Sequence, residues 1–179
     1  MPALRSSHQW YQRHQLISRQ VPHNILSWLF DTASLTARLK RHCPNRFSVH
    51  VINQTMARPT PEEHKILDIP YGRSALMRQV YLYCNEIPMI YARTIIPLKT
   101  LSGAQRIYAN LGSKPLGEML FADRTMHRDE VMVAEFKLTE LPLNESVEDD
   151  TCWGRRSVFR VGSKPLLVSE YFLPGLFGI

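Results

Sequence analysis

The feature that most constrains this chain is a succession of short strand-like runs joined by tight turns, with no long helix between them. The segment ALMRQVYLYCNEIPMIYARTIIP divides into two β-branched and aromatic runs around Asn85-Glu86, which predicts a hairpin. The closing segment holds two further runs, WGRRSVFRV and KPLLVSEYFLP. Parallel βαβ units need a long crossover between their strands, so this order argues against a Rossmann arrangement. We predict an α+β fold with a largely antiparallel sheet of about six strands.

Short helices are expected before and between the strands. NILSWLFDTASLTARLKRH predicts two of them, and the second begins after Ser34, an N-cap residue that immediately precedes Leu35. SKPLGEML predicts another helix near Leu116, because the preceding Pro115 is of a type favoured at the first helical position. FSVHVINQ and TMHRDEVMVAEFKLTEL alternate apolar and polar residues and predict further strands.

The length of 179 residues favours a single domain, 1–179, with a basic N-terminal arm at 1–22 that carries no acidic residue. The arm lacks the apolar region of a signal peptide, and no run reaches the roughly 18 apolar residues of a membrane span. We therefore expect a cytoplasmic monomer without stable membrane insertion. The formal charge of +6 is compatible with nucleic acid, but most arginines are scattered along the chain, so we expect no nucleic-acid partner.

Three cysteines, Cys43, Cys84 and Cys152, form no CxxC pair and leave an odd count. This pattern argues against a disulfide framework and against a zinc site, and it fits a reducing compartment. The stretch HRDE at 127–130 lies on an alternating strand, where neighbouring side chains point to opposite faces. No P-loop, GxGxxG, GxSxG or HExxH motif is present, so nucleotide binding and serine hydrolysis have no supporting motif, and we expect no metal site.

A carboxylate stands in one of the most apolar runs, at Glu170 of KPLLVSEYFLP. Either Glu170 faces solvent from an edge strand, or it lies over a cavity. Arg78, on the strand RQVYLYC, is its natural partner in a cavity, because a buried unpaired charge is costly. Backbone N–H groups at Leu35 and Leu116 lack intrahelical acceptors, and two converging helix starts hold a carboxylate well. Each helix start considered alone is more simply interpreted as an ordinary helix end with no ligand-binding role.

Five motifs follow one another between residues 78 and 174: RQVYLYCNEIPMIYA, RTIIPLKTLSG, LGSKPLGEMLF, RDE and WGRRSVFRVGSKPLLVSEYFLP. Together they resemble the bacterial chorismate lyases (chorismate pyruvate-lyases), and the resemblance covers about residues 24–174. The resemblance implies an enzyme that cleaves chorismate to 4-hydroxybenzoate and pyruvate, the first step of ubiquinone biosynthesis, with no metal or cofactor. It also implies a largely antiparallel sheet that encloses the product in an internal cavity under helical flaps.

The same resemblance implies the site residues. The family's ligand-contacting arginine falls on Arg78, its glutamate on Glu170, and its two backbone amides on Leu35 and Leu116. Methionine is the family's common residue at the position of Leu35, so the amide is kept and the pocket shape changes. Arg78 then neutralises a carboxylate or the leaving group, whereas Glu170 either holds the C4 hydroxyl or accepts the C4 proton. The loop at 141–151 is longer than the family suggests, and the N-terminal arm does not align clearly.

A non-catalytic alternative stays open. The effector domains of a large family of bacterial transcription regulators are similar in fold to chorismate lyases and bind small molecules instead. Such a domain normally follows a winged-helix region, which the arm at 1–22 is too short to form, so we favour the lyase. Arg93 and Arg155 either serve the leaving pyruvyl group or brace the sheet, and we favour bracing.

Overall fold

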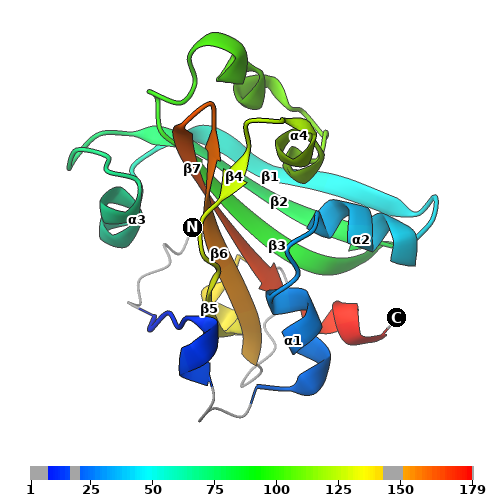
Figure 1. Ribbon diagram of the computed structural model, residues 1–179. Coiled ribbons are helices and arrows are strands. Elements are labelled where there is room, and N and C mark those ends of the chain that lie inside the picture. Colours follow the sequence, from blue (N-terminus) through cyan, green and yellow to red (C-terminus); the bar gives the residue numbers. More distant parts are fainter. Residues whose placement is uncertain (1–7, 17–20, 143–150, 179) are drawn as a thin grey trace.

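A seven-stranded antiparallel sheet forms the centre of the molecule (Figure 1). The computed structural model describes residues 8–16, 21–142 and 151–178. Its strands are β1 (Phe47–Ala57), β2 (Ala75–Cys84), β3 (Ile87–Ile96), β4 (His127–Arg128), β5 (Met132–Lys137), β6 (Thr151–Val161) and β7 (Lys164–Phe172). They follow the order β1-β2-β3-β7-β6-β4, and β5 pairs with β6 beside β4. The predicted α+β class is confirmed, with seven strands instead of about six.

The helices are short, as the sequence predicts. They are α1 (His23–Leu29), α2 (Leu35–His42), α3 (Pro61–Ile66) and α4 (Leu116–Ala122), with 3-10 turns η1 (Arg13–Leu16), η2 (Gly103–Asn110), η3 (Leu138–Glu140) and η4 (Pro174–Gly178). Ser34 caps α2, because its Oγ accepts a hydrogen bond from the Ala37 amide at 3.3 Å. Pro115 is the N-cap of α4 rather than its first residue, since its ψ of 124° is extended.

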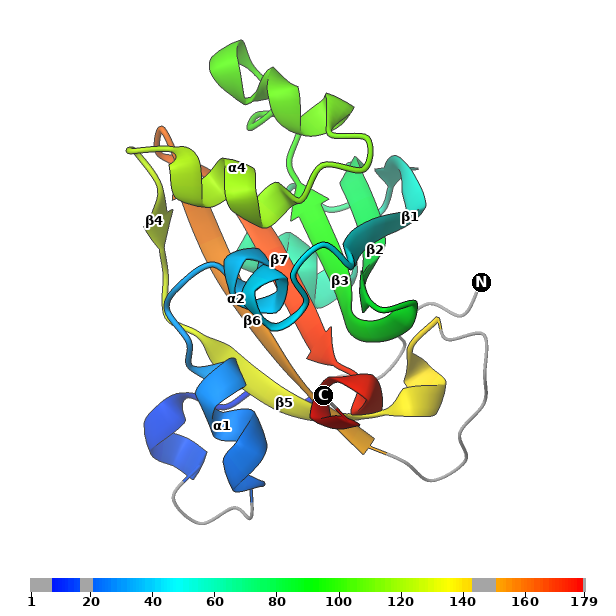
Figure 2. The same cartoon turned by 90° about the vertical axis from the view of Figure 1, so that its right-hand side faces the viewer.

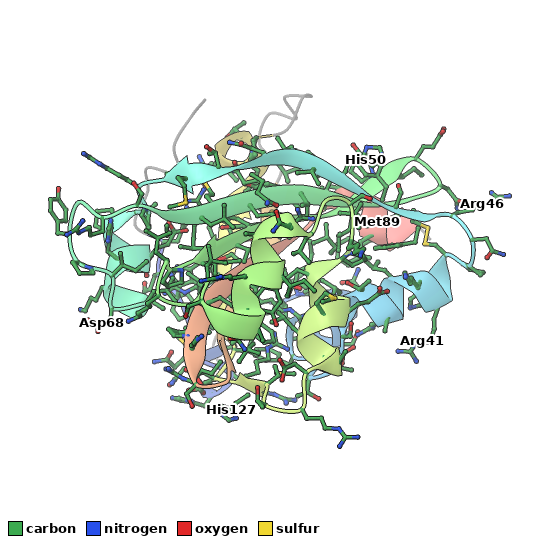
Figure 3. The ribbon with its side chains drawn as sticks, turned by 90° about the horizontal axis from the view of Figure 1, so that it is seen from above. Arg41, Arg46, His50, Asp68, Met89 and His127 are labelled. Carbon is green, nitrogen blue, oxygen red and sulfur yellow. A yellow bond between two sulfur atoms is a disulfide. The ribbon has the colours of Figure 1, made fainter. Side chains whose placement is uncertain are left out.

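The helices are divided between the two faces of the sheet. Helices α2 and α4 lie over one face, and α3 lies against the other (Figures 1 and 2). Seen from above, Asp68, which follows α3, and Arg41, in the last turn of α2, lie at opposite sides of the molecule (Figure 3). In the same view, His50 on β1 and His127 on β4 mark the two opposite edges of the sheet. Glu170 therefore lies on an inner strand, β7, between β3 and β6.

Two separate apolar clusters pack between the sheet and its helical cover. The first includes Ile25, Leu29, Leu35, Leu39, Val80, Leu82 and Ala92. The second includes Leu76, Ile96, Leu120, Phe159, Val161 and Val168. Apart from Met89, which lies where the register of β3 against β2 shifts, the residues of β2, β3 and β7 in both clusters have even numbers, so they share one face of the sheet. The gap between the clusters is where the pocket described below lies.

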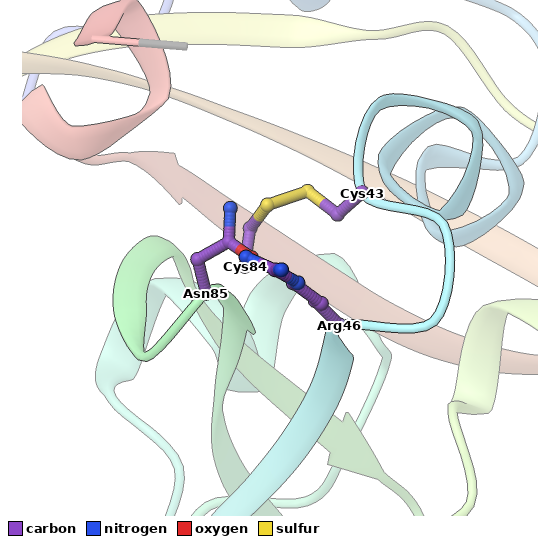
Figure 4. Close-up of a disulfide and its surroundings, with 4 residues drawn as sticks. All are labelled: Cys43, Arg46, Cys84 and Asn85. Atoms are coloured by element: carbon purple, nitrogen blue, oxygen red, sulfur yellow. A yellow bond between two sulfur atoms is a disulfide. The ribbon is translucent and has the colours of Figure 1, made fainter.

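The cysteine pattern argues against a disulfide framework, but the structure contains one disulfide. Cys43, the C-cap of α2, forms a disulfide with Cys84 at the end of β2, and their Cα atoms are 5.8 Å apart (Figure 4). Beside it, the Arg46 side chain donates to Asn85 Oδ1 at 3.2 Å. An odd count and the absence of CxxC do not exclude this bond, because the fold joins residues 41 positions apart. Cys152 stays a buried free thiol.

The described part of the N-terminal arm packs against the sheet. Tyr11 and Val133 exchange two backbone hydrogen bonds of 2.8 and 2.9 Å, which adds an isolated bridge beside β5. Leu16 is buried in the first apolar cluster. Residues 143–150 of the predicted loop at 141–151 lie outside the described residues. Among the helices that are described, none combines the length and the apolar character needed to cross a membrane.

Candidate active site

A pocket lies between the two apolar clusters, with the sheet as its floor and the starts of α2 and α4 as its cover. Most of its wall is apolar and comes from β2, β3, β7, α2 and α4. The polar side chains that line it are Thr36, Arg78, Thr94, Arg128, Arg155 and Glu170. All four residues predicted for the site, Leu35, Arg78, Leu116 and Glu170, are among its lining residues.

Glu170 contributes the carboxylate of this pocket. It is an inner-strand residue with a side chain only 16% exposed, so the interpretation of Glu170 as a solvent-facing edge residue was wrong. It pairs across the ladder with Ala92 on β3 and with Arg155 on β6. A cavity rather than packed hydrocarbon lies above it, which explains a carboxylate inside an apolar strand.

The ion-pair partner of Glu170 is Arg155 and not Arg78. Arg155 Nε donates a hydrogen bond of 2.6 Å to Glu170 Oε2, and the Arg155 side chain is 2% exposed. Its Nη1 donates to the backbone carbonyls of Trp28 and Asp31, at 2.8 and 2.9 Å. These carbonyls belong to the last turn of α1 and the linker after it, where helical carbonyls lack intrahelical donors. Arg155 therefore braces β6, β7 and α1 together, as the bracing interpretation predicts.

Arg78 reaches the pocket from the far side of β3. One strand, β3, and two residues along the ladder separate Arg78 from Glu170, because Arg78 pairs with Thr94, and Thr94 pairs with Val168 on β7. With strands about 4.8 Å apart, their backbones are roughly 10 Å or more from each other. Arg78 is 2% exposed but has no carboxylate partner in the described part of the chain. Burial lowers the pKa of its guanidinium.

A bulge in β1 supplies the main partner of Arg78. The register of β1 against β2 shifts between Val51 and Asn53, so that Gln54 pairs with Arg78 and shares its face. Gln54 Oε1 then accepts from Arg78 Nη1 at 2.6 Å. Arg78 Nη2 donates to the carbonyl of Gly112 at 2.8 Å, in the loop before α4. Val51, the last residue before the shift, is 41% exposed, although simple alternation predicts it to be buried.

The two predicted helix starts converge over the pocket. Leu35 and Leu116 are the first residues of α2 and α4, and both line the cavity. The helices approach so closely that a Cβ on Gly117 would lie 2.9 Å from Thr36 Oγ1. An ion pair between Lys40 and Glu118 joins the same two helices on their exposed side. Backbone N–H groups in the first turns have no intrahelical acceptors and carry the positive end of the helix dipole.

Arg128 is a pocket residue that the sequence analysis missed. It lies on the two-residue strand β4, where it pairs with Phe159 of β6. Its Nε donates a hydrogen bond to Ser157 Oγ, and its Nη1 donates one to the Asp31 carbonyl, each with a length of 3.0 Å. Burial and the like charge of Arg155 lower the pKa of Arg128 to about 10, although Glu170 and Asp31 oppose the shift. The signal was present in HRDE, where alternation sends Arg128 to the face opposite His127.

Two further arginines of the strands, Arg93 and Arg156, face away from this pocket. Arg93 is buried on the other side of β3, where its Nε and Nη2 donate to the two carboxylate oxygens of Glu63 on α3, at 2.8 and 2.9 Å. Arg156 donates to Glu62 at 2.7 Å and lies over the ring of Trp10. The bracing role predicted for Arg93 is confirmed. The adjacent Arg155 and Arg156 therefore point to opposite faces of the sheet.

An antiparallel sheet with helices over an internal pocket defines the class of α+β domain to which this chain belongs. Several solved structures share this fold. The C-terminal domain of the histidine utilization repressor from Pseudomonas syringae pv. tomato matches with a TM-score of 0.57 at 13% identity, over 72% of this chain and 92% of that one. A GntR-family regulator from Bacillus cereus matches with a TM-score of 0.54 at 12% identity, over 73% and 93%. At these identities the likeness concerns the fold alone.

Within this class, the chain belongs to the chorismate lyase family, whose model matches residues 4–178. A probable chorismate pyruvate-lyase from Methylococcus capsulatus is 42% identical over 86% of this chain and 96% of its own length. Another, from Alcanivorax borkumensis, is 37% identical over 98% of this chain and 80% of its own length. The resemblance found in the sequence motifs is thereby confirmed.

Proposed function

We propose that this protein is a chorismate pyruvate-lyase that converts chorismate to 4-hydroxybenzoate and pyruvate. The observation that carries the proposal is the convergence of Arg78, Glu170 and the starts of α2 and α4 on one pocket. These groups come from four distant parts of the chain, and they are the ones that the family resemblance selects. The 33–42% identity to relatives named as probable chorismate pyruvate-lyases supports the same activity.

We assign the ring carboxylate of chorismate to the side of the pocket that holds Arg78 and the amides of Leu35 and Leu116. Helix-start amides and a guanidinium both favour an anion, and together they fix its orientation. Glu170 then faces the C4 end of the ring. There it either accepts a hydrogen bond from the C4 hydroxyl or takes the C4 proton.

The reaction is an elimination that makes the ring aromatic. A base removes the proton from C4, and the electron pair of that C–H bond forms the C3–C4 double bond. The C3–O bond breaks with its electron pair on the ether oxygen, which releases enolpyruvate. Enolpyruvate takes up one proton on carbon and becomes pyruvate. Because aromatisation drives the reaction, positioning of the substrate and stabilisation of leaving-group charge are the main tasks of the protein.

The pocket also favours the aromatic product, which keeps the ring and its carboxylate. We therefore expect release of 4-hydroxybenzoate to limit turnover. A rapid first turnover followed by a slower steady state is the expected time course. Removal of 4-hydroxybenzoate by a second enzyme is expected to raise the steady-state rate, and an unchanged rate contradicts product limitation.

The experiment that tests the activity is incubation of the purified protein with chorismate while both products are measured. We expect 4-hydroxybenzoate and pyruvate in equal amounts. Glu170→Gln and Arg78→Gln are expected to lower kcat/KM about 100-fold or more, the usual loss when a charged or hydrogen-bonding group is removed from a developing anion. Arg156→Gln is the matched control, because Arg156 lies on the opposite face of the sheet and pairs with Glu62.

Two outcomes separate the alternatives. Tight binding of 4-hydroxybenzoate without formation of either product contradicts the lyase and assigns the chain to the ligand-binding effector domains. If the wild-type protein is active, Glu170→Gln separates the two roles of Glu170. Glutamine accepts a hydrogen bond but not a proton, so lost turnover with retained product affinity identifies Glu170 as the base.

The proposal includes a cytoplasmic monomer that feeds ubiquinone biosynthesis. The Cys43–Cys84 disulfide makes the compartment worth testing, because such bonds are uncommon in reducing compartments. Alkylation of free thiols in intact cells, followed by thiol titration, measures whether Cys43 and Cys84 are oxidised there. Light scattering of the purified protein measures its molar mass and so tests the monomer.

A further inference from the structure

The pocket has a charge surplus that Glu170 does not balance. Three arginines and one glutamate line it, which leaves two positive charges in excess. The proposed substrate, chorismate, is a dianion with a ring carboxylate and an enolpyruvyl carboxylate. The present inference rests on that proposed function and concerns where the second carboxylate binds.

Arg155 is not available for a substrate carboxylate. Its Nε is engaged by Glu170, and its Nη1 donates to the carbonyls of Trp28 and Asp31. A guanidinium that is 2% exposed and held by a carboxylate and helix-end carbonyls is already neutralised. The two excess charges therefore belong to Arg78 and Arg128.

Arg78 and Arg128 approach the pocket from opposite sides. Arg78 extends from β2, on the far side of β3 from Glu170. Arg128 extends from β4, on the far side of β6 from Glu170. The Glu170–Arg155 pair lies between them on β7 and β6. With its ring carboxylate near Arg78 and its C4 carbon near Glu170, chorismate directs its C3 substituent towards one side of the pocket. The side next to β4 is the one that carries a second cation, Arg128.

The guanidinium of Arg128 is held in place with one end unused. Ser157 Oγ accepts from Nε and the Asp31 carbonyl accepts from Nη1, while the ring of Phe159 lies 5.2 Å from the guanidinium carbon. Within the described residues, Nη2 has no acceptor. The lowered pKa of Arg128 agrees with this arrangement, because burial and the neighbouring Arg155 disfavour its charged form more than the nearby negative charges favour it.

We propose that Arg128 binds the enolpyruvyl carboxylate of chorismate. In the elimination, the electron pair of the broken C3–O bond passes to the ether oxygen, and the departing enolpyruvate gains a negative charge beside this carboxylate. A fixed guanidinium at that position stabilises the leaving group as its charge develops. The product 4-hydroxybenzoate has lost the enolpyruvyl carboxylate and makes no contact with Arg128.

The test compares substrate and product in Arg128→Gln and Arg128→Lys. We expect Arg128→Gln to lower kcat/KM for chorismate about 100-fold. The dissociation constant of 4-hydroxybenzoate, measured by calorimetry, is expected to stay within about threefold of the wild-type value. Lysine keeps the charge but loses the planar fork, so Arg128→Lys is expected to recover part of kcat/KM. Arg160→Gln is the matched control, because Arg160 on β6 pairs with the partly exposed Asp129.

Parallel losses of kcat/KM and of product affinity overturn the proposal, because they place Arg128 at the ring carboxylate or in a purely structural role. Unchanged kcat/KM in Arg128→Gln overturns it as well. If the wild-type protein does not convert chorismate, the proposed function fails, and intact chorismate serves as the probe in the same calorimetric comparison. A selective loss of chorismate affinity over 4-hydroxybenzoate affinity in Arg128→Gln then still supports the second carboxylate subsite, and equal losses contradict it.

Discussion

Arg155 Nε donates a hydrogen bond of 2.6 Å to Glu170 Oε2, and the two residues are direct cross-strand neighbours on β6 and β7. This pair fixes one oxygen of the pocket carboxylate and leaves the rest of the group to face the cavity. The same arginine holds the end of α1 through backbone carbonyls. The orientation of the proposed catalytic carboxylate and the position of the helical cover therefore depend on one side chain.

We predict that Arg155→Ala lowers the free energy of unfolding by about 3 kcal/mol or more, because it leaves Glu170 and several carbonyls without their donor. Urea unfolding measures this loss. The neighbouring Arg156→Ala is the control, and it is expected to cost about 1 kcal/mol, since Arg156 makes a single ion pair with the exposed Glu62 and a contact with Trp10. Equal losses in the two variants contradict the bracing role.

The close approach of α2 and α4 makes Gly117 a sensitive position. A methyl group there meets Thr36 Oγ1 at 2.9 Å, so Gly117→Ala forces the helix starts apart. We expect an affinity for 4-hydroxybenzoate about tenfold weaker, consistent with an overpacking cost of about 1–3 kcal/mol. The double variant Gly117→Ala/Thr36→Ala removes the clashing oxygen and is expected to recover affinity, as calorimetry can measure. Additive losses in that double variant argue that the contact does not set the pocket shape.

The Cys43–Cys84 disulfide closes a loop of 41 residues between the end of α2 and the end of β2. By the loop-entropy relation, such a cross-link stabilises the folded state by up to about 4 kcal/mol. We expect reductant to lower the thermal midpoint of the oxidised wild-type protein, as scanning calorimetry will measure. Cys43→Ala/Cys84→Ala is expected to show a low midpoint that reductant does not change. Burial raises the pKa of Cys152 to about 12, so this thiol is not expected to exchange with the pair.

The buried Glu63–Arg93 pair predicts a pH dependence of stability. Burial opposes ionisation of Glu63, but hydrogen bonds and charge from Arg93, together with the Thr60 amide, outweigh it and lower the pKa of Glu63 below 4.5. A lowered folded-state pKa means that the stabilisation is fully present above pH 4.5 and is lost as the pH falls through the folded pKa. Urea unfolding between pH 7 and pH 3 measures it.

Variants of two adjacent glutamates isolate this contribution. Glu63→Gln is expected to cost about 3 kcal/mol at pH 7 and to show a shallower loss towards pH 3, because its contribution no longer titrates. Glu62→Gln is the control, since Glu62 makes an exposed ion pair with Arg156. The same acid slope in Glu63→Gln and in wild type contradicts the assignment.

Local sequence patterns determined the hairpin, the short helices, the Ser34 cap and the antiparallel class, because each depends on neighbouring residues. The hairpin turn at Asn85 and Glu86 forms with both residues at positive φ, and the apolar runs on either side pair as the alternation predicts. The family resemblance selected Leu35, Arg78, Leu116 and Glu170, and all four line one pocket. Their roles in the reaction stay predictions.

Tertiary structure alone decided which charges meet. Arg155 is 15 residues from Glu170 and Arg78 is 92, but nothing in that spacing says which arginine pairs with the glutamate. Strand order answers it, since β6 lies beside β7 whereas β3 separates β2 from β7. The Cys43–Cys84 disulfide, the bulge that turns Gln54 towards Arg78, and the inward direction of Arg128 arise in the same way. Each depends on contacts between distant segments, whose geometry is set by the packing of the whole chain and not by local preference.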